Sequence, residues 1–97
     1  MFARVVTVQV QPGKADEATS IYRDSVVPAG KQQKGHSGFM MLVDPNTGKG
    51  LSIALWETEA DMKAGEASGY LQQQLAKFAS LLAAAPVTEH YEVRVQS

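Results

Sequence analysis

Apolar residues recur along this chain with two different periods, and the changes between them predict its elements. Residues 2–10 (FARVVTVQV) are rich in β-branched side chains and predict a first strand. Residues 39–43 (FMMLV) are apolar throughout, which is typical of a strand buried on both faces. The turn sequence DPNTG joins this strand to a third one at about 49–57, so the two form a hairpin. The segment 87–95 (VTEHYEVRV) alternates apolar and polar residues and predicts a fourth strand.

The segment after the first strand has apolar residues at helical spacing. It begins near Lys14, behind a Pro-Gly turn, and acidic residues in its first turn favour the positive end of the helix dipole. Pro28 does not fit inside this helix, so either the helix kinks there or a second short helix covers 29–33. Residues 34–38 (KGHSG) then predict a loop before the second strand.

A second helical segment follows the third strand. The hydroxyl of Thr58 can cap the first turn, with Asp61 three residues later in an approximate capping box. The helix covers about 59–67 and is interrupted by a Ser-Gly pair. A further helix spans about 70–84, and an Ala-Pro pair ends it before the fourth strand.

The elements read β-α-β-β-α-β along the chain. This order predicts an α+β, ferredoxin-like domain over residues 1–97, with an antiparallel sheet and helices on one of its faces. The third strand is apolar on both sides: Leu51, Ile53 and Leu55 on one, Ala54 and Trp56 on the other. A single copy would therefore leave a large apolar sheet face exposed to water. We expect a homodimer that packs sheet against sheet.

The composition excludes several classes of protein. The 97 residues include 9 basic and 10 acidic ones, with a net charge of −1, and no basic block predicts binding to nucleic acid or to a membrane surface. The absence of cysteine excludes disulfides, thiolate catalysis and thiolate metal sites. No apolar run approaches the ~20 residues of a membrane span, and the start of the chain reads as a strand rather than a signal peptide. We expect a cytoplasmic protein.

Residues 10–72 carry a series of short motifs in a fixed order. These are P-G-K after the first strand, V-P-A before a loop that ends in G-F, a short hairpin, a strand that ends in W-E-T-E-A, and S-x-Y-L after a helix. In order and spacing they resemble the antibiotic biosynthesis monooxygenase family of dimeric α/β barrels. The resemblance implies a homodimer with a pocket between each sheet and its helices. Some members of the family oxidise polycyclic aromatic compounds with dioxygen and no cofactor, others degrade haem, and many have no known activity.

The chain departs from that family at its histidines. Members often carry a His nine residues after the strand-ending aromatic and another five later, where this chain has Gly65 and Tyr70. The haem-degrading branch uses a helix His as axial ligand and an Asn on the first strand. This chain has no His between Glu57 and Glu89, and its only Asn is Asn46, in a turn. We therefore predict no haem and no other cofactor.

Trp56, the only tryptophan, ends the third strand where a helix begins. Strand alternation places it on the same face as Ser52 and Ala54. The two small residues could leave a cavity with the indole as its wall, or they could let a helix approach closely while Trp56 fills the corner. We favour the second interpretation, although a core tryptophan can also form the floor of a pocket.

The two histidines lie far apart in the sequence. His36 is in a loop (GHSG) whose spacing does not match a nucleophile elbow, so we expect it to face solvent. His90 is on the polar face of the fourth strand and could act as a base near neutral pH, or it could be an edge or interface residue. With no carboxylate at a ligand spacing, one chain encodes no transition-metal site.

Other polar side chains could contact a ligand. Tyr22 and Tyr70 lie on helix faces expected to look at the sheet, where a hydroxyl would orient a substrate or bond to the backbone. Arg4 and Arg23 could pair with an acidic ligand, although exposed ion pairs explain them as well.

Three functions fit these observations. The first is a cofactor-independent monooxygenase for a small aromatic substrate, the second a non-catalytic small-molecule binder or structural dimer, and the third a haem-handling protein, which the missing His disfavours. The residues leave open whether the chain is an enzyme, and the resemblance places the monooxygenase first. The candidate catalytic residues are His90 and Tyr70, and the candidate substrate-binding residues are Trp56, Ser52, Tyr22 and Phe39.

Overall fold

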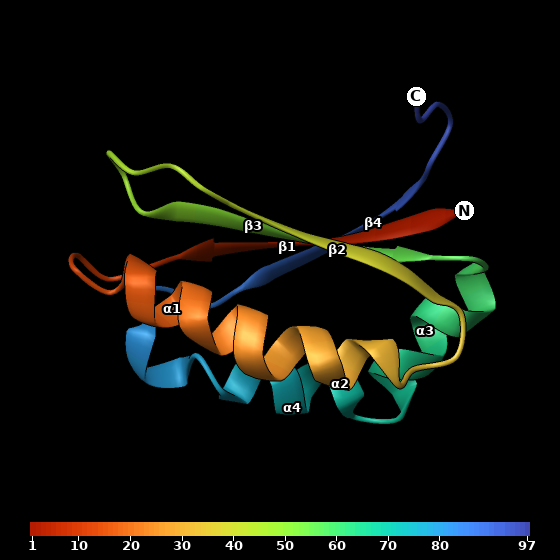
Figure 1. The fold of residues 1–97 in the computed structure, drawn as a ribbon, viewed down its shortest axis with the longest axis horizontal. Coiled ribbons are helices and arrows are strands. Elements are labelled where there is room, and N and C mark those ends of the chain that lie inside the picture. Colours follow the sequence, from red (N-terminus) through yellow and green to blue (C-terminus); the bar gives the residue numbers. More distant parts are fainter.

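The computed structural model, which describes residues 1–97, contains a four-stranded antiparallel sheet with helices on one face (Figure 1). The strands are β1 (Phe2–Gln9), β2 (His36–Val43), β3 (Lys49–Trp56) and β4 (Val87–Glu92). They lie in the order β2-β3-β1-β4, so the first and last strands pair in the sheet although they are far apart in the sequence. This topology confirms the predicted α+β, ferredoxin-like fold.

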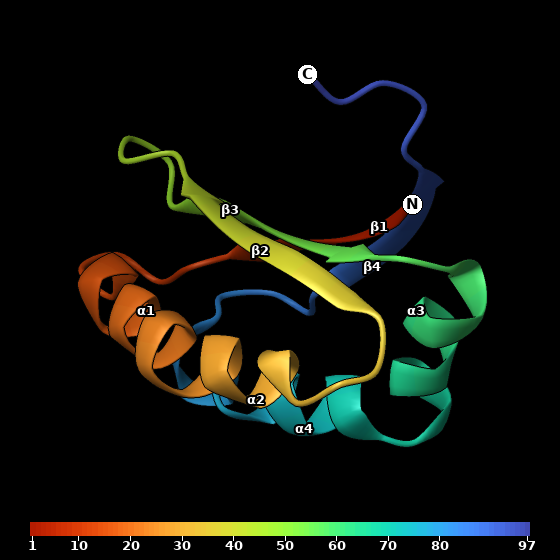
Figure 2. The same cartoon turned by 45° about the vertical axis from the view of Figure 1, so that its right-hand side comes forward.

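The helices form two connected stretches below the sheet (Figures 1 and 2). They comprise α1 (Ala15–Ile21), a π-helical turn η1 (Tyr22–Val26), α2 (Val27–Lys31), α3 (Glu59–Ala67), α4 (Tyr70–Ala76) and a 3₁₀ turn η2 (Ala79–Leu81). Pro28 lies in the first turn of α2, where its missing N–H is tolerated, as in the second predicted alternative, but α2 ends at Lys31 rather than at residue 33 and follows η1 without a break. As predicted, the hydroxyl of Thr58 accepts a hydrogen bond from the Asp61 N–H (3.1 Å) and caps α3. None of the helices is long and apolar enough to cross a membrane.

The second strand begins earlier than predicted. It starts at His36 rather than at Phe39, because His36 pairs with Trp56 at the end of β3 and a bulge follows before Gly38. The backbone N–H of Glu57 donates to the carbonyl of Gly35 (2.8 Å) and extends this pairing. The prediction of a solvent-facing loop histidine was therefore wrong: His36 is a half-buried strand residue.

The C-terminal part of the chain also differs from the prediction. β4 ends at Glu92 rather than near residue 95: Glu92 pairs with Phe2, the first residue of β1, and beyond it the Val93 N–H donates one further bond to the Met1 carbonyl (2.9 Å). The last helix ends at Ala76 rather than near residue 84. In the turns that follow it, backbone N–H groups bond to the carbonyl three residues back rather than four, so the α-helix does not continue. Beyond them Leu82 forms an isolated bridge with Val10, which ties this segment to the sheet.

The sheet has a covered inner face and an uncovered outer face (Figures 1 and 2). The helices pack only on the inner face, where Trp56 and Met62 are fully buried. The outer face has large apolar side chains with exposed fractions of about one half: Met40 54%, Leu42 44%, Val87 57% and Tyr91 50%. The prediction that the second strand is buried on both faces was therefore wrong for a single chain, because nothing covers the outer face.

Candidate functional site

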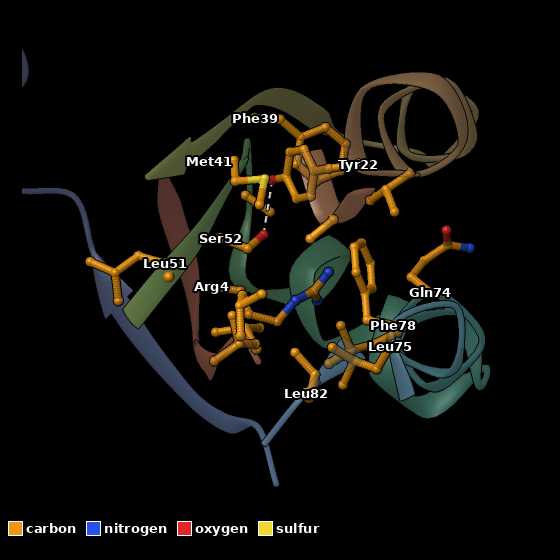
Figure 3. A pocket seen from close by; sticks show the side chains of 18 of the residues that line it. Arg4, Tyr22, Phe39, Met41, Leu51, Ser52, Gln74, Leu75, Phe78 and Leu82 are labelled. Carbon is orange, nitrogen blue, oxygen red and sulfur yellow. Dashed lines mark hydrogen bonds between the residues drawn. The ribbon is translucent and has the colours of Figure 1, made fainter. Parts of the chain in front are cut away.

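A cavity of about 60 Å³ lies between the inner face of the sheet and the helices (Figure 3). Most of its wall is apolar, and the polar side chains in it are Arg4, Tyr22, Ser52, Tyr70 and Gln74. A water molecule needs about 10–15 Å³ of such space, so the cavity has room for a few waters or for a small ligand.

Small residues on β3 create this space. Gly50, Ser52 and Ala54 all belong to its wall, and none of them reaches far from the strand. At one end the cluster of Val10, Ala18 and Leu81 closes the core, and at the other end Ala54 packs with Trp56 and Met62. The cavity is therefore a gap between two well-packed ends of one core.

Arg4 is the only charged residue of the cavity wall, and only 2% of it is exposed. It lies on β1, and its guanidinium points into the space between sheet and helices (Figure 3). Nη1 donates a hydrogen bond to the carbonyl of Met62 (3.1 Å), and Cζ lies 5.1 Å from the centre of the Trp56 ring, within cation–π range. Burial lowers the pKa of Arg4, and the nearby Glu66 carboxylate opposes this shift.

The charge of Arg4 is only partly compensated. The nearest carboxylate oxygen, Oε2 of Glu66, lies 3.6 Å from Nη1. The same carboxylate lies closer to His90, with Nε2 at 2.8 and 2.9 Å from its two oxygens. An almost completely buried cation thus shares a single carboxylate with a second group, which leaves it able to attract a further anion.

His90 lies beside Arg4 across the β1–β4 pair, on the inner side of the edge strand, and its side chain is 40% exposed. It is not part of the cavity wall. Glu66 stands between it and Arg4, so the structure connects His90 to the site only through this carboxylate. A direct role as a base inside the cavity is not supported by this geometry.

Tyr70, by contrast, is buried in the cavity wall, and its hydroxyl has no hydrogen-bond partner. Burial raises its pKa, and the positive charge of Arg4 opposes this shift. Gly65 lies against both side chains: a Cβ there would be 3.5 Å from Cδ2 of Tyr70 and 3.7 Å from Nη1 of Arg4. The Tyr70 ring and the Arg4 guanidinium therefore lie close together beside Gly65, and the unsatisfied hydroxyl lies near Gly30.

Tyr22 and Ser52 form a second polar pair in the wall. Their hydroxyl oxygens are 2.9 Å apart, and the Tyr22 hydroxyl also donates a long bond to the carbonyl of Met40 (3.5 Å) (Figure 3). Burial raises the pKa of Tyr22, and its hydrogen bond with Ser52 opposes this shift. Tyr22 and Val26 begin and end the π-helical turn η1, and both line the cavity. Because the two hydroxyls already form hydrogen bonds with each other, they can accept a contact from a ligand but do not require one.

Trp56 is completely buried and is not part of the cavity wall. It fills the corner where β3 meets α3, the interpretation favoured from the sequence, and its indole N–H has no partner. One side of the ring faces the Arg4 guanidinium, and the His36 ring meets it edge-on at 5.4 Å. Trp56 therefore packs against the Arg4 guanidinium and helps to hold it in position.

Of the six residues predicted for the site, the structure brings four together at the cavity: Tyr22, Phe39, Ser52 and Tyr70. Trp56 and His90 lie outside it. For Arg4, sequence reasoning left open an acidic ligand or an exposed ion pair, and it did not include this residue among the predicted site residues. The signal was available, because strand alternation puts Arg4 on the same face as Val6 and Val8, two residues expected in the core.

Haem does not fit this site. No histidine lines the cavity, and its volume is far below that of a porphyrin. The structure also contains no group of three or more His, Cys, Asp or Glu side chains that could hold a metal ion.

A comparison with protein families identifies the family of this chain. The family model described as antibiotic biosynthesis monooxygenase matches residues 1–77. An uncharacterised protein of Mycobacterium tuberculosis is 34% identical over 64 residues, which are 66% of this chain and 27% of the relative. A second uncharacterised protein of that organism is 28% identical over 97 residues, covering 96% of this chain and 41% of the relative. The chain thus spans less than half the length of these curated relatives.

Solved structures show the same fold. A monooxygenase of Streptomyces coelicolor, in complex with the ligand nanaomycin D, has a TM-score of 0.81 and 18% identity, with 99% of this chain and 89% of that one covered. A protein of unknown function from Nitrosomonas europaea has a TM-score of 0.73 and 22% identity, with 99% and 91% covered. At these identities the likeness concerns the fold alone.

Proposed function

Since the chain belongs to the antibiotic biosynthesis monooxygenase family, we propose that it is a cofactor-independent monooxygenase whose substrate is a small phenolic compound bound in the cavity as its anion. The observation that carries this proposal is the incompletely compensated Arg4 in an otherwise apolar cavity, beside the unpartnered hydroxyl of Tyr70. A phenolate oxygen would receive a charge-assisted bond from Arg4 and a second bond from Tyr70. Its ring would contact the apolar wall.

This arrangement supplies the stabilisation of the substrate anion that the reaction needs. Arg4 lowers the pKa of a bound phenol and so increases the electron-rich anion that reacts with dioxygen. The para carbon forms a bond to oxygen, the proton on that carbon is lost, and cleavage of the O–O bond releases the outer oxygen as water. A phenol and dioxygen thus give a para-quinone and water, and all electrons come from the substrate. The dry wall protects the intermediate from side reactions.

The size of the cavity restricts the substrate. Its volume of about 60 Å³ is below the roughly 150 Å³ of a cavity that takes up benzene, so side chains of the wall must move even for a single ring, and a polycyclic skeleton would need far more space. We therefore propose a monocyclic phenol, although the resemblance alone would have favoured larger aromatics. In this scheme Arg4 and Tyr70 contact the substrate, whereas Glu66 and His90 position Arg4 from outside the cavity.

A non-catalytic binding protein is the second candidate. The observation that favours it is the lack of a proton acceptor in the cavity, whose polar groups are an arginine, two tyrosines, a serine and a glutamine. Such a site would bind the anion of an aromatic compound without converting it. Both candidates share the same binding geometry, so only turnover separates them.

We also propose that two copies associate through the outer face of the sheet. The support is the set of half-exposed, large apolar side chains that this face presents to water. Association of the two sheets would give the dimeric barrel that the sequence motifs imply.

The test combines binding and turnover. 4-Nitrophenol is a suitable probe because its para carbon is blocked and its phenolate absorbs visible light. At constant pH we expect a larger fraction of the bound probe than of the free probe to be ionised to the phenolate. Phenols with a free para carbon, such as resorcinol, should show oxygen uptake above that with heat-denatured protein. In Tyr70→Phe turnover should fall about 10-fold, because one donor to the oxyanion is lost. Probe binding without any oxygen uptake would support the binding protein instead.

A further inference from the structure

A second hollow lies on the surface next to the cavity. This outer depression is lined by six residues: Val27, Lys31, His36, Ser37, Gly38 and Phe39. Of these, only Phe39 also belongs to the wall of the inner cavity. Its half-buried side chain therefore separates the cavity from the surface between α2 and β2.

The Phe39 ring is held by two aromatic side chains and by the backbone of α2 at Gly30. It meets the Tyr22 ring edge-on at 5.5 Å and lies against the His36 ring at 4.2 Å. Gly30 of α2 faces the ring so closely that a Cβ there would collide with it, and the same Cβ would lie 3.1 Å from the Tyr70 hydroxyl. The ring thus stands directly in front of the hydroxyl that has no partner.

Two cations lie along the route from the outer depression to the cavity. Lys31, the last residue of α2, lines the outer depression, is exposed and takes part in none of the ion pairs of the structure. Arg4 lies at the inner end, in the cavity wall. An anion that passes Phe39 would move from one cation to the other, which favours its capture and orients it.

We propose that Phe39 gates the cavity: small aromatic anions enter from the outer depression when its ring swings aside, and its size limits which ligands pass. The ligand class rests on the proposed function, whereas the route rests on the position of the ring. Closure of the ring behind the ligand would exclude water from the region between Arg4 and Tyr70.

The experiment measures 4-nitrophenolate association and dissociation by stopped flow in wild type, Phe39→Ala and Phe2→Ala. Phe2 is the matched control, because it is also a half-buried phenylalanine packed on the core but lines neither the cavity nor the outer depression. We expect both rate constants to rise about 10-fold in Phe39→Ala, since the conformational step before binding is removed, and to change much less in Phe2→Ala. Phe39→Leu, which keeps more of the packing, should give an intermediate rise and replaces Phe39→Ala if that variant does not fold.

A second set of variants tests the contribution of the Lys31 charge. Lys31→Gln should lower the association rate about 2–3-fold at low salt, and added salt should remove this difference. Lys49→Gln is the control, because Lys49 is an exposed cation that lines neither hollow. The dissociation rate should not change in either lysine variant.

The outcomes separate this proposal from the previous one. Equal rates in wild type, Phe39→Ala and Phe39→Leu, with normal probe affinity, would overturn the gate and leave the proposed function intact. Binding to Phe39→Ala but not to wild type would support a closed gate. Oxygen uptake is not needed for any of these measurements, so a purely binding protein would still reveal the gate. No binding by any variant would overturn both proposals.

Discussion

The two faces of the sheet are built from the same four strands but present opposite surfaces. The inner face is covered by helices, contains many small side chains on β3, and holds the buried cation Arg4 next to unpartnered or self-paired hydroxyls. The outer face is uncovered, and large apolar side chains on β2 and β4 stand half exposed on it. The inner face thus buries a charge beside a cavity, whereas the outer face exposes apolar surface to which a second copy could bind.

This difference shows how one sheet can offer a cavity on its inner face and an apolar surface for association on its outer face. On the inner face, small residues leave space, and burying Arg4 there costs stability that Glu66, the Met62 carbonyl and the Trp56 ring offset only in part. On the outer face, association would remove apolar surface from water and so stabilise the fold. The following experiments change one face and ask whether the other responds.

The largest effect is expected for Arg4→Met, which removes the charge but keeps most of the volume. We expect oxygen uptake and 4-nitrophenolate binding to fall about 100-fold, because the group that stabilises the anion is lost. The free energy of unfolding should change by no more than about 1 kcal/mol, since the removal of a buried cation offsets the loss of its hydrogen bond to the Met62 carbonyl and of its pairing with Glu66. Oxygen-electrode assays and urea unfolding measure the two effects.

Arg23→Met is the matched control for this change. Arg23 is exposed and pairs only with its neighbour Asp24, so we expect neither activity nor stability to change. Loss of activity in Arg4→Met together with a large loss of stability would contradict a binding role, because it would show that Arg4 holds the fold together.

The next largest effect is expected on the outer face, for Leu42→Asp. Leu42 is 44% exposed in a single chain, so the fold should tolerate the change, whereas a two-fold interface would bury the new charge twice. We expect the dissociation constant of the dimer to rise about 100-fold, which is about 2.7 kcal/mol. Sedimentation velocity at several concentrations measures it.

Gln72→Asp, an exposed change on the helical side, should leave the dimer intact. A wild-type chain that sediments as a monomer at micromolar concentration would remove the outer face from consideration as a dimer interface. Unchanged probe binding in a monomeric Leu42→Asp variant would show that the two faces act independently.

The smallest effect concerns His36, at the margin of the inner face. Burial lowers its pKa from the ordinary value of 6.5, and the charges of Arg4 and Lys31 lower it further. The unfolded chain therefore binds this proton more readily than the folded protein, so stability decreases as the pH falls through the unfolded-state pKa. In His36→Phe this part of the acid destabilisation should disappear. Urea unfolding between about pH 5 and pH 8 measures it, and an unchanged pH slope would contradict the assignment.

The sequence determined much of the fold because the signals for it are local. Turn residues, the Thr58 cap and the change of apolar period placed every strand and both helical regions close to where the structure has them. The ends were less predictable: β2 begins at His36 and β4 ends at Glu92 because pairing partners on other strands fix these limits.

The sequence also determined which residues face the helices, since strand alternation fixes this, and four of the six predicted site residues do line the cavity. Only the tertiary structure decided which polar side chains meet there. The pairing of β1 with β3 and β4 puts Arg4 between Trp56 and the Glu66–His90 pair, contacts that join residues more than fifty positions apart. The same packing placed His90 outside the cavity and made Trp56 a support rather than a wall. A cavity is the space that distant side chains fail to fill, and no local pattern in the sequence records that space.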